Sequence, residues 1–466
     1  MKRCLFILTA LTLAGCAHFE SKPIEPAKSA AQLEARRLDD PGLEKFLEQN
    51  LGRELPGWPL SSWDLPALTL AAFYFQPSLE VARAQWRVTQ AGVKTAGGRP
   101  NPTLALTPGY NTTHSIPSPW FPAVNLDIPV ETAGKRGKRI AEASQLSESA
   151  RLNIITAAWQ VRSNVRTSLL DFQVAGRRAG LLENQSATQQ HIVNLLQQRF
   201  DAGAISRPEL TIAQIAFNRT QLDLADAKSK RAEARSRLAE AIGLSSAALD
   251  ELNVKFDFSP DDMTSLTAAE ARRVALQSRS DILAALSDYI ASEDELRLQI
   301  AKQYPDVHLN PGYQFDQGDN KWSLGVTFEL PILNQNQGPI AEARAQRELS
   351  AAKFTALQAQ VIGGIDRAVA ALGVAREQLK TGNSLLAAQQ AQQTSAQAQL
   401  EAGAADRLDL LNARLEFDSV SLVQLESAAQ LQRALGALED ALQQPADAIP
   451  AAVEKTLPEN PNHSSP

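Results

Sequence analysis

The feature that most constrains the fold is an internal duplication with a period of about 200 residues. The stretch RFDAGAISRPEL begins at Arg199, and the similar stretch QLEAGAADRLDL begins at Gln399. Other segments recur at the same spacing: Ile140-Ala141-Glu142-Ala143 is repeated at 340–343. Self-similarity on this scale indicates one structural unit used twice. We therefore predict two structural repeats, at 61–245 and 246–443.

Each repeat contains two segments whose hydrophobicity alternates as in β-strands. They cover about 103–113 and 121–131 in the first repeat, and about 306–316 and 321–332 in the second. In the second pair all apolar residues share one face, which holds Val307, Leu309, Tyr313, Trp322, Leu324, Val326 and Phe328. Strands of about ten residues with this pattern suit a bilayer crossing, with lipid on one side and water on the other. The alternative is a small soluble β-subdomain.

The number of these strands has a consequence for assembly. Four strands are too few to close a barrel, and an open strand edge is not tolerated in lipid. If the strands cross a membrane, several copies of the chain must therefore contribute to one barrel.

The remainder of each repeat is predicted to be long helices. No proline interrupts the stretch from about 133 to 200 or the stretch from 340 to 400. At ~1.5 Å per residue, helices of that length reach roughly 90–100 Å. Too little chain surrounds them to bury them, so we expect coiled-coil packing. A seam of leucines follows the second motif, and its first-repeat counterparts are different residues: Leu415, Asp418, Leu422 and Leu425 match Ile215, Asn218, Leu222 and Ala225.

The duplicated motif itself is predicted to be a helix-to-helix turn. Gly203 and Gly403 supply left-handed backbone angles where the first helix ends. Ser206 and Asp406 are placed to cap the following helix, with Glu209 and Asp409 three residues later, as in a capping box. A well-capped turn explains these residues. It explains less well why four others recur, namely Arg207, Leu210, Arg407 and Leu410.

The N-terminus has the pattern of an export signal. Lys2 and Arg3 precede an apolar stretch that ends in Leu13-Ala14-Gly15-Cys16. This ending resembles the bacterial lipobox, so we predict a signal peptide at 1–15 and a lipid attached to Cys16; the alternative is an ordinary secretory signal. Ala17, rather than Asp, then implies sorting to the outer membrane. We expect an extended anchor segment at 16–60 and a proline-rich tail at 444–466.

Several classes of function find no support. The net charge of −6 and the pI near 5.6 give no basic field for nucleic acid. The five histidines are scattered and form no HExxH motif, so we predict no metal site, no cofactor and no catalytic residues. The stretch GKRGKR at 134–139 lacks the spacing of a phosphate-binding loop, and we expect it to be a solvated or lipid-headgroup-facing basic cluster.

Taken in order, these motifs resemble the TolC family of outer-membrane efflux channels. The resemblance rests on the lipobox, the segment at 63–85, the TPGY and NPGY strands and the two tip motifs, and it spans about residues 60–443. It implies a mainly α fold with a small transmembrane β part. Coiled-coil hairpins would form a periplasmic α-barrel, and four strands per chain would contribute to a twelve-stranded barrel in a homotrimer.

The resemblance also implies a function and candidate sites. The chain would be the passive export duct of a tripartite pump, joined by a periplasmic adaptor to an inner-membrane RND-type transporter, with a lean towards the heavy-metal branch. The tips would dock the adaptor through Gly203, Arg207, Leu210, Gly403, Arg407 and Leu410. Asp409 and Asn412 align with an acidic gate; Asn412 departs from the expected Asp, and Asp409 serves equally as a cap. The alternatives are a type I protein-secretion duct and a periplasmic coiled-coil lipoprotein scaffold.

Overall fold

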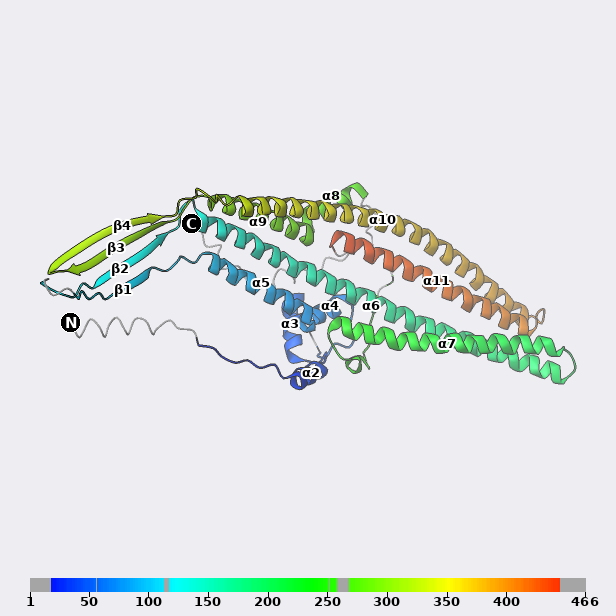
Figure 1. Ribbon diagram of the computed structural model, residues 1–466. Coiled ribbons are helices and arrows are strands. Elements are labelled where there is room, and N and C mark those ends of the chain that lie inside the picture. The colour runs from blue at the N-terminus through cyan, green and yellow to red at the C-terminus, as the bar shows by residue number, and fades with distance from the viewer. Residues whose placement is uncertain are drawn as a thin grey trace.

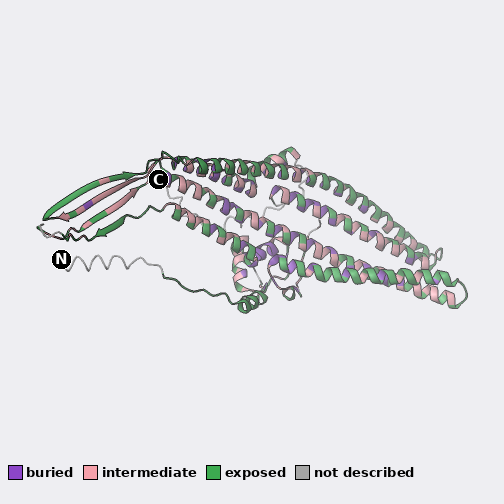
Figure 2. Ribbon diagram, viewed as in Figure 1, coloured by how far each residue is buried: buried purple, intermediate pink, exposed green. Residues whose placement is uncertain are grey.

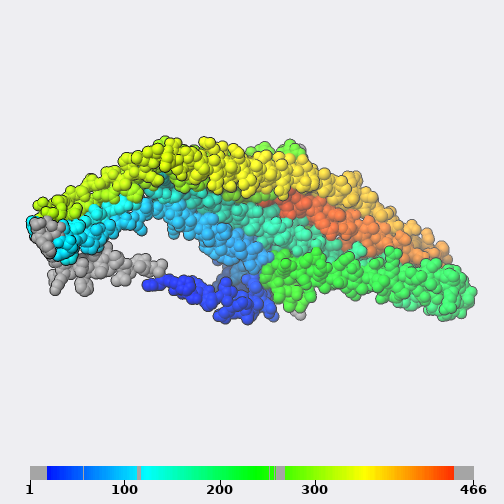
Figure 3. All heavy atoms as spheres, in the orientation of Figure 1, coloured from blue at the N-terminus to red at the C-terminus, as the bar shows by residue number. Residues whose placement is uncertain are grey.

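The computed structural model describes residues 18–55, 57–112, 117–250, 252–256, 258 and 268–444. The predicted signal peptide, Cys16 and the tail beyond Gln444 lie outside these residues. The described chain is elongated: a four-stranded sheet extends from one end of a body of long helices (Figures 1 and 3).

The same succession of elements occurs twice. A helix is followed by two strands, a very long helix and a shorter helix. In the first set these are α5 (Pro77–Ala96), β1 (Thr103–Thr107), β2 (Ala123–Val130), α6 (Lys135–Asp201) and α7 (Arg207–Ile242). In the second they are α9 (Ser280–Ala301), β3 (Val307–Asp316), β4 (Asp319–Phe328), α10 (Gln337–Glu401) and α11 (Arg407–Leu442).

Shorter helices lie around the middle of the body, namely α2 (Pro26–Glu34), α3 (Pro41–Leu51), α4 (Leu65–Phe75), the 3-10 turn η1 (Ser246–Leu249) and α8 (Ala268–Ser278). The expectation of an extended segment at 16–60 is wrong over α2 and α3. The side chain of Asp40 accepts hydrogen bonds from the backbone N–H groups of Gly42 and Leu43 and so caps α3. Leu43 and Leu47 are then fully buried, and this burial stabilises the helix.

The two longest helices are unbroken, as the proline-free stretches predicted. α6 has 67 residues and α10 has 65, so each extends for about 100 Å. Most residues of α10 are exposed, whereas most residues of α6 are partly or fully buried, because α6 lies between other helices (Figure 2). Within the described part of the chain, no helix combines the length and the apolar character of a membrane span.

The four strands form one antiparallel sheet in the order β1-β2-β3-β4. Its register puts apolar residues opposite apolar residues, as in Leu104↔Leu126, Leu309↔Val326 and Tyr313↔Trp322. Polar residues or glycine stand opposite one another on the other face, as in His308↔Thr327 and Gln314↔Lys321. The apolar face predicted from the alternation is therefore continuous across both repeats, and it lies open in the single chain: Trp322 is 80% exposed and Leu324 is 72% exposed.

Two strands end earlier than predicted. β1 stops at Thr107, short of the expected 113, and β4 stops at Phe328, short of 332. Pro108 follows β1 directly, and Pro331 lies three residues beyond β4. Proline has no N–H to donate to a neighbouring strand and restricts the residue before it, so pairing ends near both positions. A single bridge between Tyr110 and Trp120 continues the first pair outward.

The principal core lies at the middle of the body. It joins α3, α4, the middle of α6 and the end of α7, with Trp63, Leu68, Leu169 and Ile242 almost fully buried. Arg36 fastens this region from the N-terminal segment, because its Nη1 donates to the carbonyl oxygens of Phe75 at 2.6 Å and Gly243 at 3.2 Å. Two helix C-termini thereby gain a cationic partner.

A buried ionic network joins the two repeats where α6 meets α11. The Glu439 carboxylate contacts the guanidinium groups of both Arg162, at 2.8 Å, and Arg166, at 3.2 Å. Arg166 also donates to the backbone and side-chain oxygens of Gln432. All four side chains are buried, so the three charged groups are stabilised by one another and by Gln432 rather than by water.

We predict that Glu439→Ala lowers the free energy of unfolding by about 3–5 kcal/mol, because two buried guanidinium groups lose the carboxylate they contact. Urea unfolding in detergent measures the change. The matched control is Glu426→Ala, whose ion pair with Arg433 is largely exposed, and which should cost about 0–1 kcal/mol. Equal losses in the two variants would contradict the role given to this network.

Candidate functional site

The duplicated motifs form the tips of two helical hairpins, as their glycine and capping pattern predicted. Residues 202–206 connect α6 to α7, and residues 402–406 connect α10 to α11. Gly203 and Gly403 have φ of +72° and +71°, a conformation that glycine adopts without strain. The backbone N–H of the next residue then donates across the turn, to Arg199 O at 2.8 Å and to Gln399 O at 2.9 Å.

The two tips are capped by different chemistry. In the first, the Glu209 carboxylate accepts from the hydroxyl of Ser206 at 2.8 Å and from its backbone N–H at 3.3 Å. In the second, Asp406 accepts from the backbone N–H of Asp409 at 3.0 Å, and Asp409 accepts from the backbone N–H of Asp406 at 3.0 Å. Both are reciprocal capping boxes of the kind the spacing predicted.

An ion pair that the sequence analysis did not predict joins the two tips. Arg199 Nη2, at the end of α6, lies 2.7 Å from Asp406 Oδ2, at the start of α11. The hydrogen bond from Arg199 and the backbone donors at the cap lower the pKa of Asp406 below its ordinary value. Asp406 therefore serves at once as a helix cap and as the link between neighbouring hairpins.

The remaining tip candidates fall into two groups. Arg207, Arg407, Asp409 and Asn412 are exposed. Leu210 and Leu410 are each only 6% exposed. Their recurrence is explained by packing inside each hairpin, so any effect of these leucines on docking would be indirect, through the shape of the turn.

The basic stretch at 134–139 fastens the helical body to the sheet. The expectation of a solvated cluster is wrong, because Lys135 is buried and its Nζ donates to Asp306 Oδ1 at 2.8 Å. Arg139 forms an ion pair with Glu131, and Arg136 Nε donates to the carbonyl oxygen of Gly97 at 2.7 Å. The cations thus hold the ends of β2, β3 and α5 together.

A pair of carboxyl groups lies one turn further along α6. Burial and a hydrogen bond with Glu295 of α9 raise the pKa of Glu142 to about 7. Asp294 adds to the rise and Lys302 opposes it. Glu295 is itself held by the side-chain amide of Gln299, which in turn contacts Asn336 at the start of α10. Motif reasoning missed this pair, because nothing local in the sequence of α6 points to α9.

The polar face of the sheet carries its own network. His308 Nδ1 lies 2.9 Å from Asp127 Oδ1, and Asn310 Nδ2 donates to Thr327 Oγ1 at 3.0 Å. These side chains are held by one another and remain partly open to solvent. Among the described residues, no group of three or more His, Cys, Asp or Glu side chains is arranged to hold a metal ion.

Comparison with known proteins identifies the architecture. A family model described as outer membrane efflux protein matches residues 75–244 and 271–443. The cobalt-zinc-cadmium resistance protein CzcC of Cupriavidus metallidurans is 25% identical over 369 residues, covering 77% of this chain and 86% of the relative.

Solved outer-membrane channels share the fold at lower identity. VceC of Vibrio cholerae aligns with a TM-score of 0.66 at 17% identity, over 82% of this chain and 97% of its own. CmeC of Campylobacter jejuni aligns with a TM-score of 0.67 at 13% identity, over 95% and 98%. The combination of long helical hairpins and a small sheet, predicted from the two periodicities, is confirmed.

We predict that Glu142 makes the protein less stable as the pH rises. Its pKa near 7 lies above the ~4.3 of an unfolded glutamate, so the folded state binds the proton more tightly between these values. From pH 5 to pH 8 the chain should lose about 1–2 kcal/mol of stability through this group, after allowance for its partial exposure to solvent.

Thermal unfolding of Glu142→Gln at the two pH values measures the effect, and the variant should lack this loss. Glu342 occupies the equivalent position in α10 and is exposed, so Glu342→Gln is the matched control and should keep the full pH dependence. An unchanged pH profile in Glu142→Gln would rule out the assignment.

Proposed function

We propose, from the premise that this chain belongs to the outer membrane efflux protein family, that three copies assemble into one continuous export duct. Membership makes the chain the outer-membrane channel component of a tripartite efflux pump, with its helical body in the periplasm. This decides against the soluble scaffold and favours a pump over a type I secretion duct.

The observation that supports a trimer is that the outer strands of the sheet have unpaired edges. Among the described residues, β1 and β4 each pair on one side only, so both edges of the sheet are open in the single chain. Edges exposed to lipid would leave backbone donors and acceptors unsatisfied at a cost of several kcal/mol each. Three copies joined edge to edge provide the twelve strands of a barrel, with the apolar face towards lipid and the polar face towards the lumen.

The polar face supports passive conduction. His308, Asp127 and Asn310 would line the barrel and exchange contacts with passing solutes without chemical change, so the duct needs no cofactor and performs no enzymatic step. The periplasmic adaptor of an RND-type pump would meet the hairpin tips at the exposed Arg207 and Arg407, with Gly203 and Gly403 setting their backbone. Similarity to CzcC supports the heavy-metal branch for the exported substrate.

Asp409 and Asn412 are the proposed gate residues. Both lie exposed in the first turns of α11, where three copies would bring their side chains together around the tunnel mouth. One oxygen of Asp409 accepts the hydrogen bond of the cap, and its charge remains available to the lumen. Cap and gate are therefore compatible roles for the same carboxylate.

We expect the purified trimer to conduct ions across planar bilayers, and Asp409→Asn to lower its preference for cations by on the order of two-fold, because the tunnel mouth loses one carboxylate per copy. Asn keeps an oxygen that can accept the hydrogen bond of the cap. Glu209→Gln, the equivalent change in the first tip, is the control and should leave selectivity unchanged. A trimer that carries no current would refute the channel itself.

We also propose that a lipid on Cys16 anchors the chain to the outer membrane, on the strength of the lipobox at 13–16. Palmitate labelling should mark the wild-type protein and not Cys16→Ala. Equal labelling of both proteins would exclude the anchor without affecting the barrel.

A further inference from the structure

The hairpins form an array with two free sides. α6 packs against both α7 and α11, and α11 packs against α10, so the order across the array is α7, α6, α11, α10. The contact of α6 with α11 is a seam inside the chain. The outer sides of α7 and α10 have no equivalent neighbour within the described residues.

Comparison of the two repeats shows which packing contacts are absent on the free side of α7. α7 and α11 have identical length and correspond at a shift of 200 residues. On α11, Leu425 is 6% exposed and Ala429 is fully buried, and Leu422 packs against a cluster of Ala179, Leu182 and Ala227. The equivalent positions on α7, Leu222, Ala225 and Ser229, are all exposed, Leu222 to 72%.

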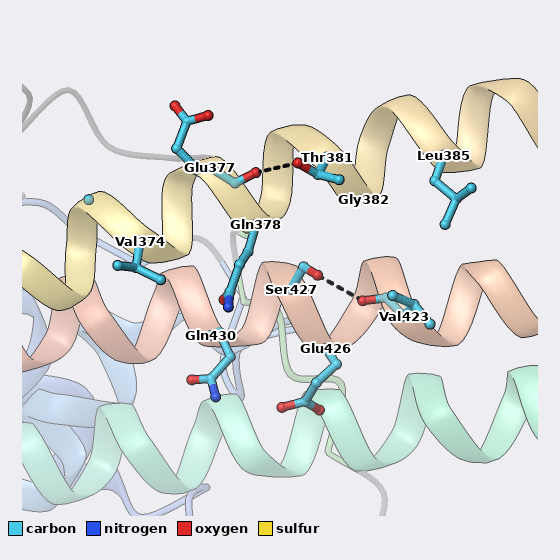
Figure 4. A pocket seen from close by; sticks show the side chains of 11 residues that line it. Val374, Glu377, Gln378, Thr381, Gly382, Leu385, Val423, Glu426, Ser427 and Gln430 are labelled. Carbon is cyan, nitrogen blue, oxygen red and sulfur yellow. Dashed lines mark hydrogen bonds between the residues drawn. The ribbon is translucent and has the colours of Figure 1, made fainter.

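On the free side of α10, residues are exposed whose equivalents on α6 are covered by a neighbouring helix. Leu170 and Val174 of α6 are covered by α11, whereas their equivalents Ala370 and Val374 of α10 are exposed. A groove of about 900 Å³ runs along this side of α10 and α11, between Val374 and Leu385 on one helix and Val423 and Gln430 on the other (Figure 4).

The two repeats differ in sequence at residues that line this groove. Leu182 of the first hairpin becomes Gly382 in the second, and Ala227 becomes Ser427. Gly382 and Ser427 both line the groove, together with the apolar side chains of Val374, Leu385 and Val423. A missing leucine side chain at Gly382 leaves space for an apolar side chain from outside the chain.

We infer that Leu222 of a second copy of this chain occupies the groove beside Gly382 and Ser427, just as Leu422 packs against Leu182 and Ala227 within one copy. The inference rests on the proposed assembly and fixes its register: α7 of one copy lies against α10 of the next at a shift of 200 residues. The groove is completed only by the neighbouring copy.

This register makes the seam between copies different in kind from the seam inside a copy. The buried pair Arg162–Glu439 has no charged counterpart, because the equivalent residues are Ile362 and Ala239, and Ala239 is buried in the core of its own copy. The half-exposed pair Asp171–Arg433 is replaced by Ala371 and Glu233. The contact between copies therefore lacks the buried ionic network that reinforces the apolar contacts within a copy.

Cysteine cross-linking tests the register directly, since the only cysteines of the chain are Cys4 and Cys16. Leu222→Cys combined with Gly382→Cys, on helices that the register puts side by side, should form a disulfide between copies, seen as dimer and trimer bands on a non-reducing gel, because only adjacent helices bring two residues within the narrow distance limits of a disulfide. Leu422→Cys combined with Leu182→Cys, the same contact inside one copy, should give no such bands.

The off-register pair is Leu222→Cys with Val374→Cys. Val374 lies eight residues, or ~12 Å, along α10 from Gly382 and should not cross-link. A trimer that links through Val374, or that remains intact by light scattering and gives no band with Gly382→Cys, overturns the register. Absence of a trimer in the unmodified protein would instead contradict the assembly, and this inference with it.

A second variant tests the contact without cysteine. Leu222→Ala removes the side chain assigned to the groove, so it should make the trimer at least ten-fold easier to dissociate in detergent. Leu222 is 72% exposed in the single copy, so the single copy should still fold. A Leu222→Ala trimer that dissociates like the unmodified protein contradicts the proposed contact.

Discussion

The constraint on which the rest of the structure depends is the hydrogen bonding of backbone groups at the edges of a four-stranded sheet. A bilayer offers no water to an open strand edge, and a sheet of this width cannot curl to meet itself. In the proposed assembly, neighbouring copies of the chain complete the sheet. In the inferred register the same incompleteness extends through the helical body, where the free sides of α7 and α10 would cover one another.

The sequence allowed the large elements to be predicted because their signals are local. Alternation over ten residues determined which face of β3 is apolar, and the absence of proline over sixty residues predicted α6 and α10. Strand ends were less predictable, because an alternating pattern continues past Pro108 although the regular strand is interrupted there and only an isolated bridge follows. The helix α3 was missed because its signal is short and its stability comes from burial against distant residues. The helix α2 has only nine residues and buries none of them, so it carries no apolar pattern to detect.

The contacts of the candidate site were predictable only in part. Ser206, Glu209, Asp406 and Asp409 cap their helices as expected, since each cap is complete within four residues. The link from Arg199 to Asp406 spans 207 residues, and the Glu142–Glu295 pair joins two helices from different repeats, so no local pattern indicates either. Leu210 and Leu410 show the converse case, in which residues that recur at the tips are buried within their own chain.

The unbroken length of α6 has a mechanical consequence. From Arg166, where the buried network holds the helix, to its end at Asp201 there are about 35 residues, or roughly 50 Å. A small rigid rotation about that network, made by this segment together with the helices packed on it, would be amplified over this length. A tilt of about 5° there would displace the tip by roughly 4 Å, more than the length of an ion pair, with no residue changing its secondary structure. A displacement of several ångströms at the hairpin tips therefore requires only a tilt of a few degrees near the middle of the body.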